Sequence, residues 1–156
     1  MLWVICGAGR FVGKTMVAHK LCRVLDESIY VKCGHGEANP AKPKNFCRTL
    51  DELSQFIDAV SNINPHIVIE SNAYAKTGKA DIVIFLDGAA PFANQTCFRA
   101  DREALCELAD LTVTIDDGFE NWLEVLSKKT HGLALETEVL REISWILDEQ
   151  RQFLFE

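Results

Sequence analysis

Eight residues near the start of the chain have the types and the order that phosphate binding requires. Residues 8–15 read Ala-Gly-Arg-Phe-Val-Gly-Lys-Thr, the P-loop (Walker A) pattern with alanine in place of its first glycine. Glycine before the lysine lets the backbone approach an anion closely, and consecutive N–H groups then form a concave nest. An apolar stretch precedes the segment and a helical pattern follows it, so the phosphates would meet a helix N-terminus. The segment predicts a site for a nucleoside triphosphate.

The side chains of this segment have separate expected roles. Lys14 would act catalytically, by holding its charge at the β- and γ-phosphates. Thr15 offers a hydroxyl to Mg²⁺, which otherwise keeps phosphate oxygens and water as ligands. Alanine at the first position is tolerated unless that residue needs a positive φ. The expected nucleotide-binding residues of the segment are Ala8, Gly9, Arg10, Phe11, Val12, Gly13, Lys14 and Thr15.

Glu70 is the second candidate for chemistry at the same place. It ends the apolar stretch 66–70 (His-Ile-Val-Ile-Glu), and ligands of α/β sheets bind outside the carboxyl ends of the strands. A carboxylate there would hold Mg²⁺ through water or orient an attacking water, so we expect Glu70 to be a metal-site and catalytic residue. The alternative is a solvated acid at a strand end.

Lys32 lies at the end of the stretch 28–33 and His35 follows it, both at the same expected sheet edge. Each is a candidate for contact with phosphate or an anionic substrate. Thiolate and imidazole suit Zn²⁺, but Cys33 and His35 alone are too few ligands for a site in one chain. A structural loop is the simpler reading. Lys42 and Lys44 would form either a basic lid or a plain solvated loop. Since the chain has no Asn-Lys-x-Asp segment, its residues do not distinguish ATP from GTP.

Strand and helix patterns alternate along the chain and would position these residues. The predicted strands are 2–6, 28–33, 66–70, 81–86 and 111–115. The predicted helices are 14–25, 50–63, 102–109 with Asp101 as N-cap, 119–128 and 137–155. The stretches 34–45, 71–80 and 87–99 are predicted to be loops or irregular. This alternation is typical of parallel βα units, so we expect an α/β chain with three α/β/α layers and a mostly parallel sheet, the P-loop NTPase architecture.

The length of 156 residues favours one nucleotide-binding domain over residues 1–156. The last predicted helix has an apolar stripe, and Trp145 and Phe153 also lie on it, so it would pack on the sheet or form a dimer surface. Neither periodicity nor composition decides between these two uses.

Bulk composition narrows the class of protein. The formal charge of −7 disfavours a general nucleic-acid binder, which needs a basic face. The sequence contains no run of about 18 apolar residues, so no membrane span is expected. Its first residues do not have the pattern of a signal peptide. The six cysteines include no Cys-x-x-Cys pair, so we expect reduced thiols in a cytoplasmic protein.

Residues 31–35 (Val-Lys-Cys-Gly-His) and 70–72 (Glu-Ser-Asn), together with the P-loop, resemble the molybdopterin-guanine dinucleotide biosynthesis protein B family over roughly residues 1–90. The resemblance implies a homodimer that binds GTP with Mg²⁺ and hydrolyses it weakly. It also implies a partner enzyme in molybdenum cofactor biosynthesis. Gly13, Lys14, Thr15, Glu70, Lys32 and His35 are the matching residues.

Two other functions fit the same sequence. One is an ATP-dependent kinase or ligase of the dethiobiotin-synthetase-like type, in which the loops 34–45 and 71–80 would form an acceptor pocket. The other is a non-catalytic nucleotide-binding adaptor whose last helix carries the partner surface. A rate that rises with an acceptor would favour the kinase or ligase. Binding without hydrolysis, together with a stable protein complex, would favour the adaptor.

Overall fold

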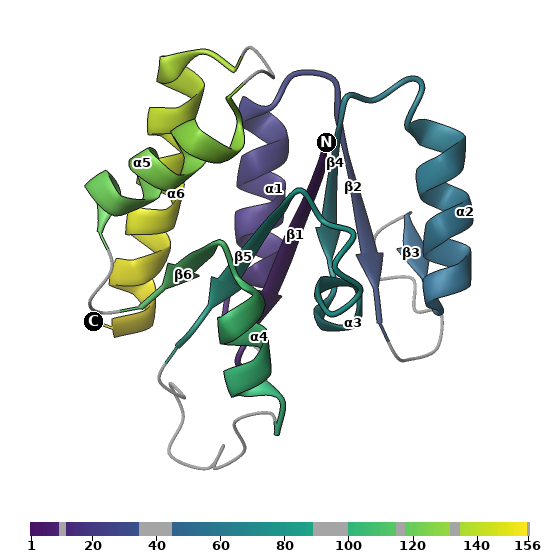
Figure 1. The fold of residues 1–156 in the computed structure, drawn as a ribbon, viewed down its shortest axis with the longest axis horizontal. Helices are drawn as coiled ribbons and strands as arrows, with labels where there is room; N and C mark the ends of the chain where they lie inside the picture. Colours follow the sequence, from purple (N-terminus) through teal and green to yellow (C-terminus); the bar gives the residue numbers. More distant parts are fainter. Residues whose placement is uncertain (10–11, 35–44, 89–99, 115–117, 132–134, 156) are drawn as a thin grey trace.

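A computed structural model of the chain describes residues 1–9, 12–34, 45–88, 100–114, 118–131 and 135–155. These residues form a six-stranded sheet with helices on both faces (Figure 1). Every pair of neighbouring strands is parallel, in the order β3-β2-β4-β1-β5-β6. The predicted α/β class with three layers is therefore confirmed. The strands are β1 (Leu2–Gly7), β2 (Ser28–Cys33), β3 (Phe46–Cys47), β4 (His66–Glu70), β5 (Ile82–Leu86) and β6 (Leu111–Val113).

The helices divide between the two faces of the sheet. One face is covered by α1 (Lys14–Val24), α5 (Phe119–Lys129) and α6 (Thr137–Phe155). The other is covered by α2 (Leu50–Val60), α3 (Asn72–Ala75) and α4 (Arg102–Leu108). Because side chains alternate along a strand, each central strand supplies both cores. In β1, Trp3 and Ile5 pack on the side of α1, whereas Val4 and Cys6 pack on the side of α2.

The central strands β1, β4 and β5 are buried on both faces of the sheet. Each is therefore encoded by a continuous apolar stretch rather than by alternating apolar and polar residues.

Local signals set the residues at which the helices begin. Thr49 caps α2 by accepting a hydrogen bond from the Glu52 N–H at 3.1 Å. Asp101 occupies the N-cap position of α4, as predicted. Its side chain makes no capping hydrogen bond, however, and forms an ion pair with Lys76 instead.

Several boundaries differ from the predicted ones. The stretch 71–80 was predicted to be a loop but contains α3, which begins where Ser71 accepts a hydrogen bond from the Tyr74 N–H at 3.1 Å. The edge strand β3 was not predicted; it forms because Phe46 and Cys47 pair with Lys32 and Cys33. Neither α3 nor β3 is long enough to show a period in the sequence.

Two predicted elements are shorter than expected. Helix α2 ends at Val60 rather than residue 63, and β6 ends at Val113, before its predicted end.

Helix α6 packs on α1, α5 and β6, so the first of the two alternatives for this helix holds. Its buried stripe includes Leu140, Ile143 and Leu147, while Trp145 and Phe153 lie on the outer side with exposed fractions of 61% and 64%. An interface through these two rings stays a prediction.

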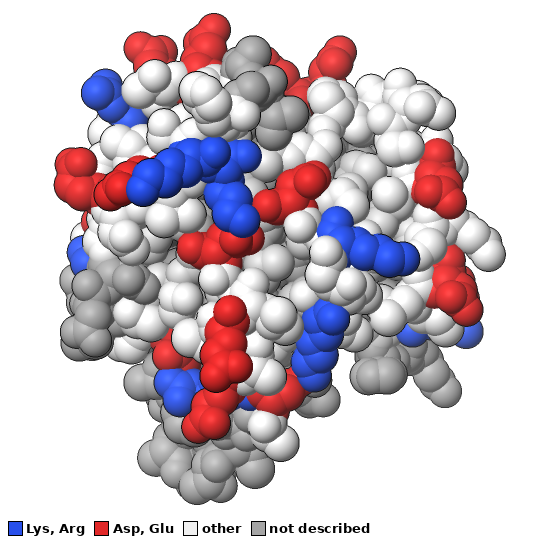
Figure 2. All heavy atoms as spheres, in the orientation of Figure 1, with Lys and Arg blue, Asp and Glu red and all other residues white. Residues whose placement is uncertain are grey.

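Charged side chains of both signs are interspersed on the face shown in Figure 2. Several are held in pairs, including Lys128 with Glu124 and Lys129 with Asp110. None of the helices in the described part of the chain is long and apolar enough to cross a membrane.

Candidate nucleotide site

The predicted site lies where the chain connections diverge at the carboxyl edge of the sheet. Strands β1 and β4 are neighbours, yet β1 leads to α1 on one face and β4 leads to α3 on the other. Ligands of open α/β sheets bind at this switch point, in the crevice between the diverging connections. The loop after β1 and the end of β4 therefore meet where a ligand is expected.

The described end of the loop after β1, at Gly13, has a backbone conformation suited to close approach of an anion. Gly13 has φ +82°, a conformation that side chains disfavour, and its carbonyl starts α1 by accepting from the Val17 N–H at 3.0 Å. The first turn of α1 contains no acidic residue, so the helix itself places no carboxylate against an anion at its N-terminus. Ala8 is buried, has no positive φ and donates its N–H to the Leu86 carbonyl at 3.0 Å, so alanine fits the first P-loop position.

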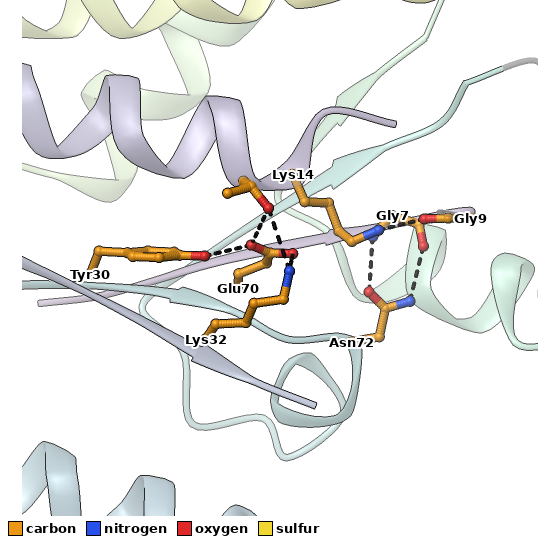
Figure 3. Close-up of polar contacts among 8 residues, drawn as sticks. Gly7, Gly9, Lys14, Tyr30, Lys32, Glu70 and Asn72 are labelled. Carbon is orange, nitrogen blue, oxygen red and sulfur yellow. Dashed lines mark hydrogen bonds and ion pairs between the residues drawn. The ribbon is translucent and has the colours of Figure 1, made fainter. Parts of the chain in front are cut away.

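Two side chains fix the shape of this loop from different directions. The Lys14 ammonium donates to the Gly9 carbonyl across the loop. The Asn72 amide holds Gly7 by both backbone groups: its Oδ1 accepts from the Gly7 N–H at 3.2 Å and its Nδ2 donates to the Gly7 carbonyl at 2.9 Å (Figure 3). The start of α3 therefore anchors the end of β1. Sequence reasoning missed Asn72, although it follows Glu70 closely.

The C-terminal helix holds the same loop from behind. Gln150 on α6 is buried and donates its Nε2 to the Val12 carbonyl at 3.0 Å. A Cβ atom placed on Gly13 would come within 2.4 Å of that Nε2, so a side chain here would displace the Gln150 amide and would also be strained by the positive φ. Gln150 was also missed, because its contact depends on the packing of α6 against a loop distant in the sequence.

Glu70 forms the centre of a polar cluster under the N-terminus of α1. Its carboxylate accepts from the Thr15 hydroxyl at 2.7 Å, from the Tyr30 hydroxyl at 2.6 Å and from the Lys32 ammonium at 2.7 Å. Figure 3 shows Tyr30 and Lys32 pointing toward Glu70 from β2. Glu70 is only 4% exposed, so it is not the solvated strand-end acid of the alternative interpretation.

The partners of Glu70 keep its carboxylate ionised. Burial raises the pKa of Glu70, but the hydrogen bonds from Lys32, Tyr30 and Thr15 outweigh burial and leave that pKa below its ordinary value. Burial and the bond to Glu70 raise the pKa of Tyr30, so the phenol remains a donor. Tyr30 was missed in the sequence, although it has the same strand parity as Lys32 and so lies on the same face of β2.

The residues present fit a magnesium ion beside a phosphate. Thr15 Oγ1 and Glu70 Oε2 lie 2.7 Å apart, and hydroxyl and carboxylate oxygens are the hard ligands that Mg²⁺ takes. Thr15 is the candidate direct ligand, and the buried Glu70 is placed to hold a metal-bound water. Both metal candidates predicted from the sequence therefore lie together, next to Lys14 at the start of α1.

Five of the candidate residues lie outside the described part of the chain: Arg10, Phe11, His35, Lys42 and Lys44. Two other residues near the carboxyl edge have partners of their own. Cys33 is buried, and its thiol donates to the Thr49 carbonyl at 3.5 Å. Asp87 forms a two-bond ion pair with Arg102, at 2.7 and 2.6 Å.

Two histidines outside the candidate site make ring contacts. Trp3 Nε1 donates to His66 Nδ1 at 3.2 Å, and the His19 ring lies 4.5 Å from that of Tyr30.

The chain matches no protein-family model, and no curated protein is significantly similar to it.

Proposed function

We propose that this protein binds a nucleoside triphosphate in the loop after β1 and hydrolyses it slowly. One observation carries the proposal: Glu70, at the end of β4, is hydrogen-bonded to Thr15 directly after Lys14 and the positive-φ Gly13. This arrangement gathers a cation, a metal-ligating hydroxyl and a buried carboxylate at a helix N-terminus. A glycine-rich turn with no ligand has no need of these groups together.

The chain's own residues would contribute to phosphoryl transfer mainly by positioning and charge. The backbone N–H groups of the loop would hold the β- and γ-phosphates. The Lys14 ammonium would give up its bond to the Gly9 carbonyl and would contact these phosphates instead. Mg²⁺, when bound, neutralises charge on the β- and γ-phosphate oxygens. Thr15 and Glu70 would orient that ion and its water.

Slow turnover follows from what the described site contains. Glu70 is the only acid at the end of β4, and three donors already hold it. Held in this way, with its pKa below the ordinary value, Glu70 is a poor base for activating the attacking water. Efficient NTPases use a water-positioning group and an arginine finger for that step.

Release of inorganic phosphate from GTP and from ATP tests this proposal. We expect slow release that depends on Mg²⁺, and a loss of at least about tenfold in Thr15→Val, because the valine keeps the shape but cannot ligate the ion. Thr77→Val, in the turn after α3, is the matched control and should keep the wild-type rate. A Thr15→Val protein as active as wild type would contradict the proposed role of the site.

The resemblance of residues 31–35 and 70–72 extends the proposal to GTP as the nucleotide and to assembly of a molybdopterin-type cofactor with a partner enzyme. GTP bound more tightly than ATP, with phosphate release that rises on addition of a molybdopterin-processing enzyme, would support this role. ATP preference, with a rate that rises on addition of a small acceptor, would point to the kinase or ligase. Binding without any hydrolysis would point to the adaptor.

A further inference from the structure

Lys32 contacts both groups that fit the metal. Its Nζ lies 2.7 Å from Glu70 Oε1 and 3.5 Å from Thr15 Oγ1 (Figure 3). Thr15 Oγ1 in turn donates to the other carboxylate oxygen, Glu70 Oε2. The ammonium therefore lies against the two oxygen-bearing groups that a magnesium ion would use.

Lys32 and a magnesium ion would compete for these oxygens. A hydroxyl has one proton and two lone pairs; the Thr15 proton is already directed to Glu70, and Lys32 approaches the oxygen from the side of its lone pairs. Mg²⁺ needs such a lone pair and a water held by the same carboxylate. Two cations at one carboxylate would also repel each other.

The Lys32 side chain is able to leave. It stands at the carboxyl end of β2 with 34% of its side chain exposed, while Glu70 beneath it is 5% exposed. A lysine is a point charge on a flexible stem, so it can turn toward water or toward a phosphate without moving the strand.

We propose that Lys32 is a tethered cation that neutralises Glu70 and takes the place of Mg²⁺, and that Mg²⁺ exchanges with it when the metal–nucleotide complex binds. The inference rests on the proposed nucleotide site. Its consequence is that metal-free nucleotide still binds, because the ammonium already balances the buried carboxylate beside the phosphates. The metal then adds little to affinity, since its entry must break the contacts of Lys32.

The test compares nucleotide affinity in excess EDTA and in saturating Mg²⁺. For wild type we expect the two dissociation constants to differ by less than about fivefold. In Lys32→Met the ratio of the dissociation constant in EDTA to that in Mg²⁺ should rise by at least about tenfold, because metal-free binding is lost while the metal-bound complex is retained. Lys32→Arg, which keeps the charge, should retain metal-free binding. Thermal denaturation of each variant establishes that it is folded.

Lys79→Met is the matched control. Lys79 is exposed just before β5, at the opposite edge of the sheet, so its loss removes the same charge away from the site and should leave both constants unchanged. Equal weakening in EDTA and in Mg²⁺ by Lys32→Met would overturn the exchange, because Lys32 would then be a simple phosphate contact. No change in either constant would overturn it as well.

A second readout needs no nucleotide. Electron paramagnetic resonance of Mn²⁺ should show at least about fivefold tighter binding of the metal alone to Lys32→Met than to wild type. The gain should disappear in Lys32→Met/Glu70→Gln. If wild type binds neither nucleotide, the proposed function fails, and this measurement still decides the exchange: equal Mn²⁺ affinities overturn it.

Discussion

At the scale of single residues, the site depends on how Glu70 is kept charged while buried. An ionised carboxylate in the protein interior is costly unless it is paired and hydrogen-bonded. Thr15, Tyr30 and Lys32 satisfy it from α1 and β2, so three elements are joined through one side chain. Two of these donors are also expected to take part in ligand binding, Thr15 as a metal ligand and Lys32 as the cation that exchanges with the metal. Tyr30 is then the donor that keeps a purely structural role.

Tyr30→Phe tests that separation. Loss of one hydrogen bond to a buried charge should lower the free energy of unfolding by about 1.5–3 kcal/mol. Nucleotide affinity should change little, because Thr15 and Lys32 remain. Urea denaturation and calorimetry measure the two effects. Tyr74→Phe, at the other buried tyrosine, is the control. Its effect on stability should be smaller, because in the described part of the chain no carboxylate accepts a hydrogen bond from the Tyr74 hydroxyl.

His66 should make stability depend on pH. Burial, together with the N-terminal ammonium, lowers the pKa of His66, and its neutral Nδ1 accepts from Trp3. The unfolded state therefore binds more protons in this range, so this contribution to stability is complete above the ordinary value of 6.5 and is lost as pH falls through the lower folded-state pKa.

Urea denaturation between neutral and mildly acidic pH measures this dependence. His66→Gln cannot titrate and should flatten the slope relative to wild type. If both proteins lose stability in parallel as the pH falls, another group is responsible.

At the scale of elements, the P-loop is held by neighbours on both faces of the sheet. Helix α3 anchors its start through Asn72, and α6 supports its end through Gln150. If the proposed nucleotide binds here, these contacts would reduce the entropy that the described ends of the loop lose on binding.

Gln150→Met should weaken nucleotide binding by roughly three- to tenfold while leaving the protein folded. The methionine fills a similar volume but leaves the Val12 carbonyl without its donor, so the loop loses part of its preorganisation. Calorimetry with GTP and ATP measures the change. Gln152→Met lies on the exposed side of α6, where Gln152 bonds to Asp148, and should bind as wild type does. Equal affinities of the two variants would show that α6 does not position the loop.

The elements that could be predicted are those with a long or uniform pattern. The bounds of β2, β4 and α6 agree with the predicted stretches because each is a sustained apolar run or a repeating helical stripe. The two-residue β3 and four-residue α3 could not be, since their formation depends on pairing and capping. The same holds for the site. Gly13, Lys14, Thr15 and Glu70 follow from local order, whereas Asn72 and Gln150 act through tertiary contacts.

At the scale of the whole molecule, two cores on opposite faces of the sheet support one functional edge. The core with α1 and α6 lies behind the P-loop, and the core with α2, α3 and α4 lies behind Asn72. The outer side of α6 carries Trp145 and Phe153, which are large exposed apolar side chains. The homodimer implied by the resemblance would find an apolar surface there.

Sedimentation equilibrium tests that expectation. Wild type should have twice the mass of one chain, and Trp145→Ser/Phe153→Ser should dissociate toward monomers, because the exposed rings would form the buried part of the interface. Ile63→Ser, an exposed apolar side chain after α2, is the control and should keep the wild-type mass. A wild-type monomer, or a double variant with unchanged mass, would contradict this placement of the interface.

The central claim is that the loop after β1 binds a nucleoside triphosphate, and calorimetry of GTP and ATP with wild type and Lys14→Ala tests it most directly. We predict saturable binding of at least one nucleotide to wild type and to Lys79→Ala, and a loss of at least about tenfold in Lys14→Ala, because one charge at the β- and γ-phosphates is removed. Absence of binding to wild type, or equal binding to Lys14→Ala, would contradict the account.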